Sequence, residues 1–175
     1  MTGSFNSPHD SIPMESIQWD SSWPELSRSD ERAFLLGYLT ERFGIPSRVF
    51  DHHIFFRRKK AWFLMQKSRQ LALVPHLKIS KVGLRAFQKV GAFIKPTTRF
   101  IQIFGHHATK GCYRLNQKQL GLLISGNEIE VDLGLDKGYV ILTLGLNRIL
   151  GLGFFINHFI RSQLPKGELK KEMII

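Results

Sequence analysis

The chain has 175 residues, of which 43% are apolar, and this is enough for a packed core in one domain or two small ones. A formal net charge of +11 at pH 7 favours a polyanionic partner. A single cysteine, Cys112, excludes an internal disulfide framework and a cysteine cluster for zinc.

The positive charge is concentrated in the middle of the chain. Residues 1–41 carry seven acidic and two basic side chains, whereas residues 42–127 carry seventeen basic side chains and one acid, Asp51. Residues 128–175 carry six of each. Such a block attracts phosphate backbones or anionic lipid surfaces, although a generically soluble basic protein would show the same total.

The first part of the sequence predicts an arm followed by a helix. Residues 1–26 are rich in Ser, Asp and Pro, so we expect an acidic, mostly disordered arm, and they lack the pattern of a signal peptide. Ser27 to Phe43 has an apolar stripe at helical spacing. Ser27 or Ser29 would cap this helix, acidic residues follow in its first turn, and Gly44 would end it.

A basic β-hairpin is expected next, from Ile54 to Met65. Its turn contains four adjacent cations, Arg57, Arg58, Lys59 and Lys60. Because Asp51 is the only acid nearby, these four cations cannot all have acidic partners, and we expect them to contact phosphates; the alternative is a solvated loop.

The segment between the hairpin and Gly91 is less regular. Lys67 to Leu73 is a candidate for a short helix, and Leu77 to Val82 alternates as a strand does. Leu84 to Val90 is compatible with either structure.

The apolar run from Phe100 to Phe104 is flanked by Lys95, Arg99 and Lys110. We expect a buried strand that ends in a tight turn at Gly105, with cationic groups at both ends. This arrangement would suit a polyanion.

The remaining elements are one helix and three strands. Asn116 can cap a helix over Gln117 to Ile124, and Glu128 to Leu133 predicts a half-exposed strand. Gly138 to Leu144 and Ile149 to Phe155 are nearly all apolar and predict buried strands. The polar and glycine residues between and within them argue against a transmembrane helix.

Several stretches resemble known RNA-binding modules. The segments IQIFGHHATKG, LGLLISGNEIEV and GYVIL…RILGLGFF are similar to a PUA domain, a small RNA-binding pseudo-barrel. The stretch from about Phe43 to Val90 resembles the pre-PUA domain of a ribosome-assembly factor of archaea and eukaryotes. VGLRAFQKVGAFIKPTTRFIQIFG and SQLPKG resemble the C-terminal RNA-binding region of Nol/Nop/Sun-type 5-methylcytosine RNA methyltransferases.

The resemblance implies an α+β chain with three parts. These are the arm (1–26), a pre-PUA-like α/β domain (27–90) and a PUA-like β pseudo-barrel (91–171). It also implies RNA binding without catalysis, because the methyltransferases' catalytic domain would precede this region and their Pro-Cys nucleophile is absent. Cys112 follows Gly111, and we expect it to be a buried filler. No glycine-rich fingerprint predicts a nucleotide cofactor, so we expect none.

We expect RNA to be contacted by basic side chains in three places. They are the hairpin tip, the PUA-like half and the tail: Arg57, Arg58, Lys59, Lys60; Lys95, Arg99, Lys110, Arg114; Arg161, Lys166, Lys170 and Lys171. The phenylalanines of the run at 100–104 are expected in the core rather than as stacking platforms.

Two histidine pairs, His52-His53 and His106-His107, raise the question of a metal site. Adjacent residues on a strand point to opposite faces and acids are scarce nearby, so we expect turn residues or RNA contacts instead of metal ligands. No combination of Ser, His and an acidic residue can be identified as a catalytic triad from the sequence, and we expect no enzymatic activity.

The predicted function is therefore a non-catalytic RNA-binding protein. It would bind structured rRNA or tRNA in ribosome biogenesis or RNA modification, in the cytoplasm or, in a eukaryote, the nucleolus, with no membrane partner. Two alternatives stay open: a protein-interaction adaptor whose basic middle docks an acidic protein, and an RNA-binding subunit of a separately encoded RNA methyltransferase.

Overall fold

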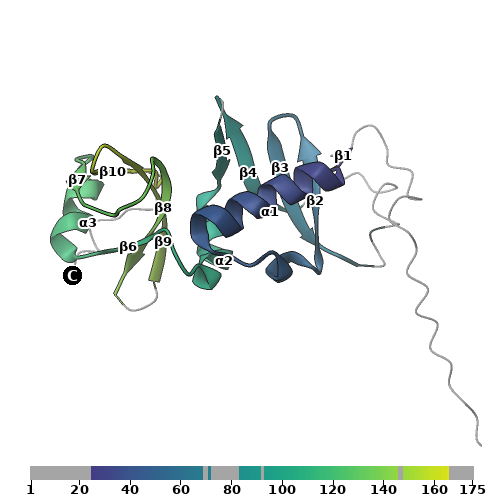
Figure 1. The fold of residues 1–175 in the computed structure, drawn as a ribbon, viewed down its shortest axis with the longest axis horizontal. Helices are drawn as coiled ribbons and strands as arrows, with labels where there is room; N and C mark the ends of the chain where they lie inside the picture. The colour runs from purple at the N-terminus through teal and green to yellow at the C-terminus, as the bar shows by residue number, and fades with distance from the viewer. Residues whose placement is uncertain (1–24, 69–70, 72–82, 92, 146–147, 166–175) are drawn as a thin grey trace, which may run out of the picture.

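Two five-stranded β-sheets and three α-helices make up the described part of the chain (Figure 1). This computed structural model describes residues 25–68, 71, 83–91, 93–145 and 148–165. The expected α+β class is confirmed. Residues 1–24 of the arm, most of the short helix expected at Lys67 to Leu73, the strand expected at Leu77 to Val82 and the basic tail lie outside the described residues. The last two residues of the arm, Glu25 and Leu26, form a short strand instead of a disordered segment.

The first sheet is antiparallel, with its strands in the order β1-β2-β3-β4-β5. The strands are β1 (Glu25–Leu26), β2 (His53–Arg58), β3 (Ala61–Gln66), β4 (Leu84–Val90) and β5 (Phe93–Pro96). The expected hairpin is confirmed as β2 and β3. The segment left open by its sequence pattern is strand β4, which pairs with both β3 and β5.

Helix α1 (Ser29–Phe43) crosses one face of the first sheet (Figure 1). Leu35, Leu39 and Phe43 are fully buried on its inner side. As expected, acidic residues lie in its first turn and Gly44, with φ 66°, ends it. The expected serine cap is wrong: Arg28 occupies the N-cap position, and no side chain there accepts a hydrogen bond.

The strand expected at residues 100–104 is also wrong. These residues belong to helix α2 (Thr98–Phe104), which continues into the 3-10 turn η4 (Gly105–His107). Thr97 caps α2 by accepting a hydrogen bond from the Phe100 N–H at 3.2 Å. The tight turn expected at Gly105 is present as η4, closed by a 3.0 Å hydrogen bond from the Ala108 N–H to the Gly105 carbonyl, and Gly105 packs close to Ile149 of β9.

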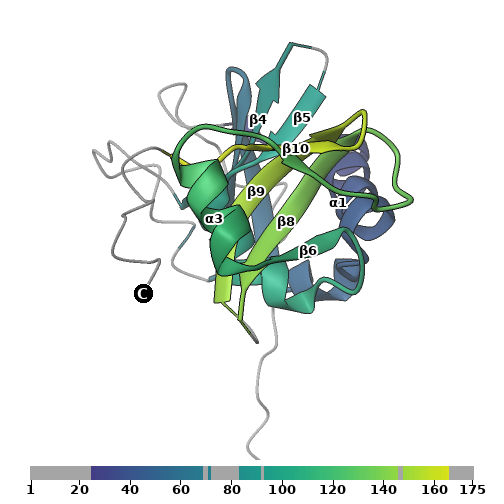
Figure 2. The same ribbon diagram turned by 90° about the vertical axis from the view of Figure 1, so that its left-hand side faces the viewer.

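The second sheet has the strand order β6-β8-β9-β10-β7, and only the β6–β8 pair is parallel. The strands are β6 (Cys112–Leu115), β8 (Gly138–Leu144), β9 (Arg148–Ile156), β10 (Phe159–Ser162) and β7 (Ile129–Glu130). The two apolar strands are confirmed as β8 and β9, whereas β7 is shorter than expected. Figure 2 shows helix α3 (Gln117–Ile124) beside this sheet. The expected cap of α3 is confirmed, because Asn116 and Gln119 form a reciprocal capping box.

The main hydrophobic core joins the two sheets. It includes Phe87 from β4, Phe100 from α2 and Leu152 from β9, all fully buried. The domain boundary expected between residues 90 and 91 falls in the β4–β5 turn, within the first sheet. In the described residues, no α-helix has the length and apolar character needed to cross a membrane.

Candidate nucleic-acid interface

Two β-hairpin turns lie next to each other at one end of the first sheet (Figure 1). Arg58 lies opposite Ala61 across the first turn, and Val90 lies opposite Phe93 across the second. The Lys89 N–H donates a 2.7 Å hydrogen bond to the Lys60 carbonyl, which joins the two hairpins. We call this region the hairpin end; its residues are Arg57, Arg58, Lys59, Lys60, Lys89, Val90 and Phe93.

The first of these turns contains a lysine in a strained conformation. Lys59 has φ 55°, in the left-handed region of backbone conformation that residues other than Gly and Asn rarely adopt. For an L-residue this conformation costs about 1–2 kcal/mol. The turn therefore holds a lysine where glycine or asparagine would give a more stable backbone.

The strand register determines which cations share a face of the sheet. Arg58, Ala61, Gln88 and Lys95 lie directly opposite one another across β2, β3, β4 and β5. Residues that are opposite in an antiparallel sheet project from the same face. Arg58 and Lys95 therefore lie on one face, and Arg57 on the other.

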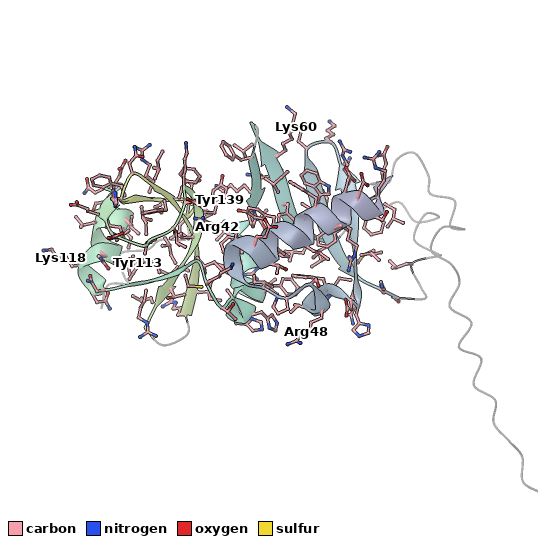
Figure 3. The ribbon with its side chains drawn as sticks, viewed as in Figure 1. Arg42, Arg48, Lys60, Tyr113, Lys118 and Tyr139 are labelled. Carbon is pink, nitrogen blue, oxygen red and sulfur yellow. The ribbon has the colours of Figure 1, made fainter. Side chains whose placement is uncertain are left out.

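Of the four cations at the hairpin tip, Arg57 has an acidic partner. Its Nη1 lies 2.6 Å from Oε1 of Glu31, in the first turn of α1. The expectation considered only acids close in sequence, and Glu31 comes from a helix that packs across the sheet. Arg58, Lys59, Lys60 and Lys89 are exposed, and none of them pairs with an acid in the part of the chain that the structure describes. Figure 3 shows Lys60 at the end of the sheet that carries the hairpin turns.

Lys95 lies between the two sheets instead of at the open end. Its Nζ donates a 2.7 Å hydrogen bond to Oε1 of Gln163 and lies 5.7 Å from the centre of the Tyr139 ring. Burial lowers the pKa of Lys95 from its usual value. Lys95 is thus partly used for packing inside the protein.

Arg42, near the end of α1, lies beside Tyr139 in the same region between the sheets (Figure 3). Its Nε donates to the Tyr139 carbonyl at 2.7 Å and its Nη1 to the Asp136 carbonyl at 2.9 Å, so it links α1 to the start of β8. We call Arg42, Lys95, Tyr139 and Gln163 the sheet junction.

Three further predicted contacts are dispersed over separate elements. Arg99 is exposed on α2, and Arg114 is exposed on the edge strand β6. Lys110 is exposed beside the end of α1, where its N–H donates to the Phe43 carbonyl at 3.1 Å. The structure does not bring these three side chains to the hairpin end.

Arg161 on β10 is paired with an acid. Its Nε lies 2.6 Å from Oε1 of Glu128, and both line a pocket of about 450 Å³ between the end of α3 and β10. The ion pair neutralises the cation that the sequence assigned to RNA. The predicted contacts Lys166, Lys170 and Lys171 lie outside the described residues.

Sequence reasoning missed Lys89 and Phe93. Both belong to the hairpin end, and Phe93 leaves 56% of its surface exposed. The motif QKVGAF, with a glycine between two short alternating runs, was a usable hairpin signal. It was missed because Leu84 to Val90 fitted a helix as well as a strand.

The histidines and the cysteine do not form a metal centre in the described residues. No group of three or more His, Cys, Asp or Glu side chains there could hold a metal ion. His53 packs against Phe50 and Phe104, and burial lowers its pKa. Cys112 is exposed, so the expectation of a buried filler is wrong; partial burial of its thiol raises its pKa, which disfavours the reactive thiolate.

No protein-family model matches the sequence, and no curated protein is significantly similar to it. The chemistry of the hairpin end must therefore support any functional interpretation.

Proposed function

We propose that this protein binds RNA through the hairpin end and does so without catalysing a reaction. The observation that carries the proposal is the grouping of four exposed cations without acidic partners in the described residues, held together by the Lys89–Lys60 backbone hydrogen bond. They are Arg58, Lys59, Lys60 and Lys89.

The arrangement has the properties of a phosphate-binding surface. Lysine and arginine side chains that contact phosphates release condensed counterions, which is a large driving force for nucleic-acid binding. The cations lie at the ends of β2 and β4 and in the turn between β2 and β3, and strand pairing brings their backbones together. Contacts of this kind position a nucleic acid without reading its sequence.

The class of RNA follows from the sequence resemblance. The PUA-like and pre-PUA-like motifs support a structured rRNA or tRNA as the ligand, and a role in ribosome biogenesis or RNA modification. The protein would then act in the cytoplasm, or in the nucleolus of a eukaryotic cell. In RNA modification, its partner would be a separately encoded RNA methyltransferase.

The salt dependence of RNA affinity tests the proposal directly. Fluorescence anisotropy of a labelled, folded tRNA transcript should give an affinity whose logarithm falls linearly with the logarithm of salt concentration, with a slope of about −3 to −4 for four phosphate contacts. A slope near zero, or no binding at low salt, would overturn the proposal.

The same cations could dock an acidic protein, which was the adaptor alternative. A labelled poly-aspartate peptide in the same salt series separates the two ligands. The RNA proposal predicts that the tRNA transcript binds more tightly than a peptide of equal charge. Tighter binding of the peptide would favour the adaptor.

A further inference from the structure

Phe93 is an aromatic side chain that the fold leaves in solvent. It is 56% exposed, and its cross-strand neighbour Val90 is 45% exposed. Most phenylalanines of the first sheet, such as Phe55 and Phe87, are buried in the core. The hairpin end therefore combines an open apolar face with cations.

The charge around Phe93 differs from that around other exposed phenylalanines. Arg58 projects from the same face of the sheet as Phe93, and the adjacent turn brings Lys60, whereas Lys89 projects from the other face. Phe159 on β10, which is 39% exposed, lies opposite Glu130 instead. Phe34 on α1 follows Glu31 by one helical turn. Among these three rings, Phe93 is the one without an acid on its own helix or on the strand that it faces, since β4 carries none.

An exposed ring bordered by cations has the chemistry of a single-strand contact. Nucleobases stack on aromatic side chains while lysines and arginines hold the adjoining phosphates. A base can stack in this way only when it is unpaired, because in a double helix both of its faces are covered by neighbouring bases. The register supports this geometry, since Arg58 projects from the same face of the sheet as Val90 and Phe93.

We infer that Phe93 stacks on the base of an unpaired nucleotide, while Arg58, on the same face of the sheet, and Lys60, in the adjacent turn, contact the phosphates next to it. The inference rests on the proposed function and deepens it. It names the ligand as single-stranded RNA, such as a loop or bulge displayed by a folded RNA. A double-stranded RNA without unpaired nucleotides would meet the cations and leave Phe93 unused.

The test compares Phe93→Ala, Phe93→Leu and Phe93→Trp with Phe159→Ala as the matched control. Each protein is titrated with a short single-stranded RNA carrying one 2-aminopurine and with a blunt duplex of the same length. Phe93→Ala should weaken single-strand binding about tenfold and leave duplex binding unchanged. Phe93→Leu should lose most of this affinity, Phe93→Trp should retain it, and Phe159→Ala should have no effect.

The fluorescence of 2-aminopurine gives an independent readout, because stacking quenches it. Quenching by the wild type and by Phe93→Trp, but not by Phe93→Ala, is the expected result. If the wild type binds single strands with normal salt dependence and Phe93→Ala binds equally well, the stacking inference is wrong and the proposed function stands. If the wild type binds neither RNA, the proposed function itself fails. Retained affinity in Phe93→Leu without quenching would indicate a merely apolar contact and also overturn the inference.

Discussion

The hairpin end and the sheet junction use the same kinds of side chain in opposite ways. At the sheet junction, Arg42 and Lys95 donate to carbonyl and amide oxygens inside the protein. At the hairpin end, Lys60 and Lys89 are exposed, and within the described residues they have no acidic partner. A high positive charge in the sequence is therefore divided between cations that stabilise the fold and cations that remain available to a ligand.

The comparison also changes where a ligand is expected. The sequence distributed the RNA contacts over the first sheet, the PUA-like half and the tail. In the described second sheet, Arg161 pairs with Glu128, and the acids Glu130 and Asp132 lie nearby in β7 and the loop after it. The first sheet thus offers the stronger attraction for phosphates.

Charge reversal at the hairpin end should produce the largest effect. The triple variant Arg58→Glu, Lys60→Glu, Lys89→Glu should weaken RNA binding by about 100-fold or more and reduce the salt slope by about two to three, because three phosphate contacts are lost. Thermal unfolding should stay nearly unchanged, since these side chains are exposed. Anisotropy and differential scanning calorimetry measure the two quantities.

A second triple variant with the same charge change serves as the control. Arg48, Lys118 and Lys137 are exposed on other elements, and Figure 3 shows Arg48 and Lys118 far from Lys60. Their replacement by Glu should reduce affinity only slightly, through the long-range field. Equal losses in the two triple variants would mean that total charge, and not the hairpin end, determines binding.

Replacing Arg42 should lower the stability of the protein and leave RNA affinity unchanged, which is the reverse of the effect expected at the hairpin end. Arg42→Met leaves the Tyr139 and Asp136 carbonyls without this donor, and we expect the free energy of unfolding to fall by about 2 kcal/mol. RNA affinity measured below the melting temperature should be unaffected. Arg48→Met is the control and should change the free energy of unfolding by less than about 0.5 kcal/mol. Urea titrations in which both variants unfold alike would contradict the structural role of Arg42.

The parts of the fold that could be predicted have local signals. Gly44 ended α1, and Asn116 capped α3, because glycine and asparagine favour these backbone positions whatever surrounds them. The run at 100–104 was misread because a short apolar run fits a strand or a helix equally well. The decisive signal was Thr97, whose cap hydrogen bond starts α2.

Which cations make up the candidate site could not be predicted from the sequence. This depends on contacts between residues that are far apart in the sequence, and such contacts have no local sequence signal. Glu31 is 26 residues from Arg57, so counting nearby acids could not detect the ion pair. Lys89 meets Lys60 only because β3 and β4 pair. The hairpin tip itself was correctly located, but which of its cations remain unpaired depended on packing across the sheet.

The stability of the fold should also depend on pH through His53, a partly buried side chain outside both regions. Burial lowers the pKa of His53 below its usual value of 6.5, so the unfolded state binds a proton more readily than the folded state. The free energy of unfolding should therefore decrease as pH falls below about 6.5. His53→Gln should flatten this part of the pH profile, whereas His52→Gln, at an exposed position, should not. Denaturant titrations at several pH values test this, and an identical slope in His53→Gln would contradict it.

The smallest expected effects come from Lys59, where stability and binding should change in opposite directions. Lys59→Asn relieves the left-handed strain, so the free energy of unfolding should rise by about 0.5 kcal/mol. The lost charge should weaken RNA binding about threefold, in line with one phosphate contact. Lys60→Asn is the matched control: it removes the same charge from the same turn, but Lys60 does not have a positive φ, so binding should weaken without any gain in stability. If Lys59→Asn stabilises the protein and leaves RNA affinity intact, the strained lysine has no role in binding, and the phosphate contacts must be assigned to Arg58, Lys60 and Lys89 alone.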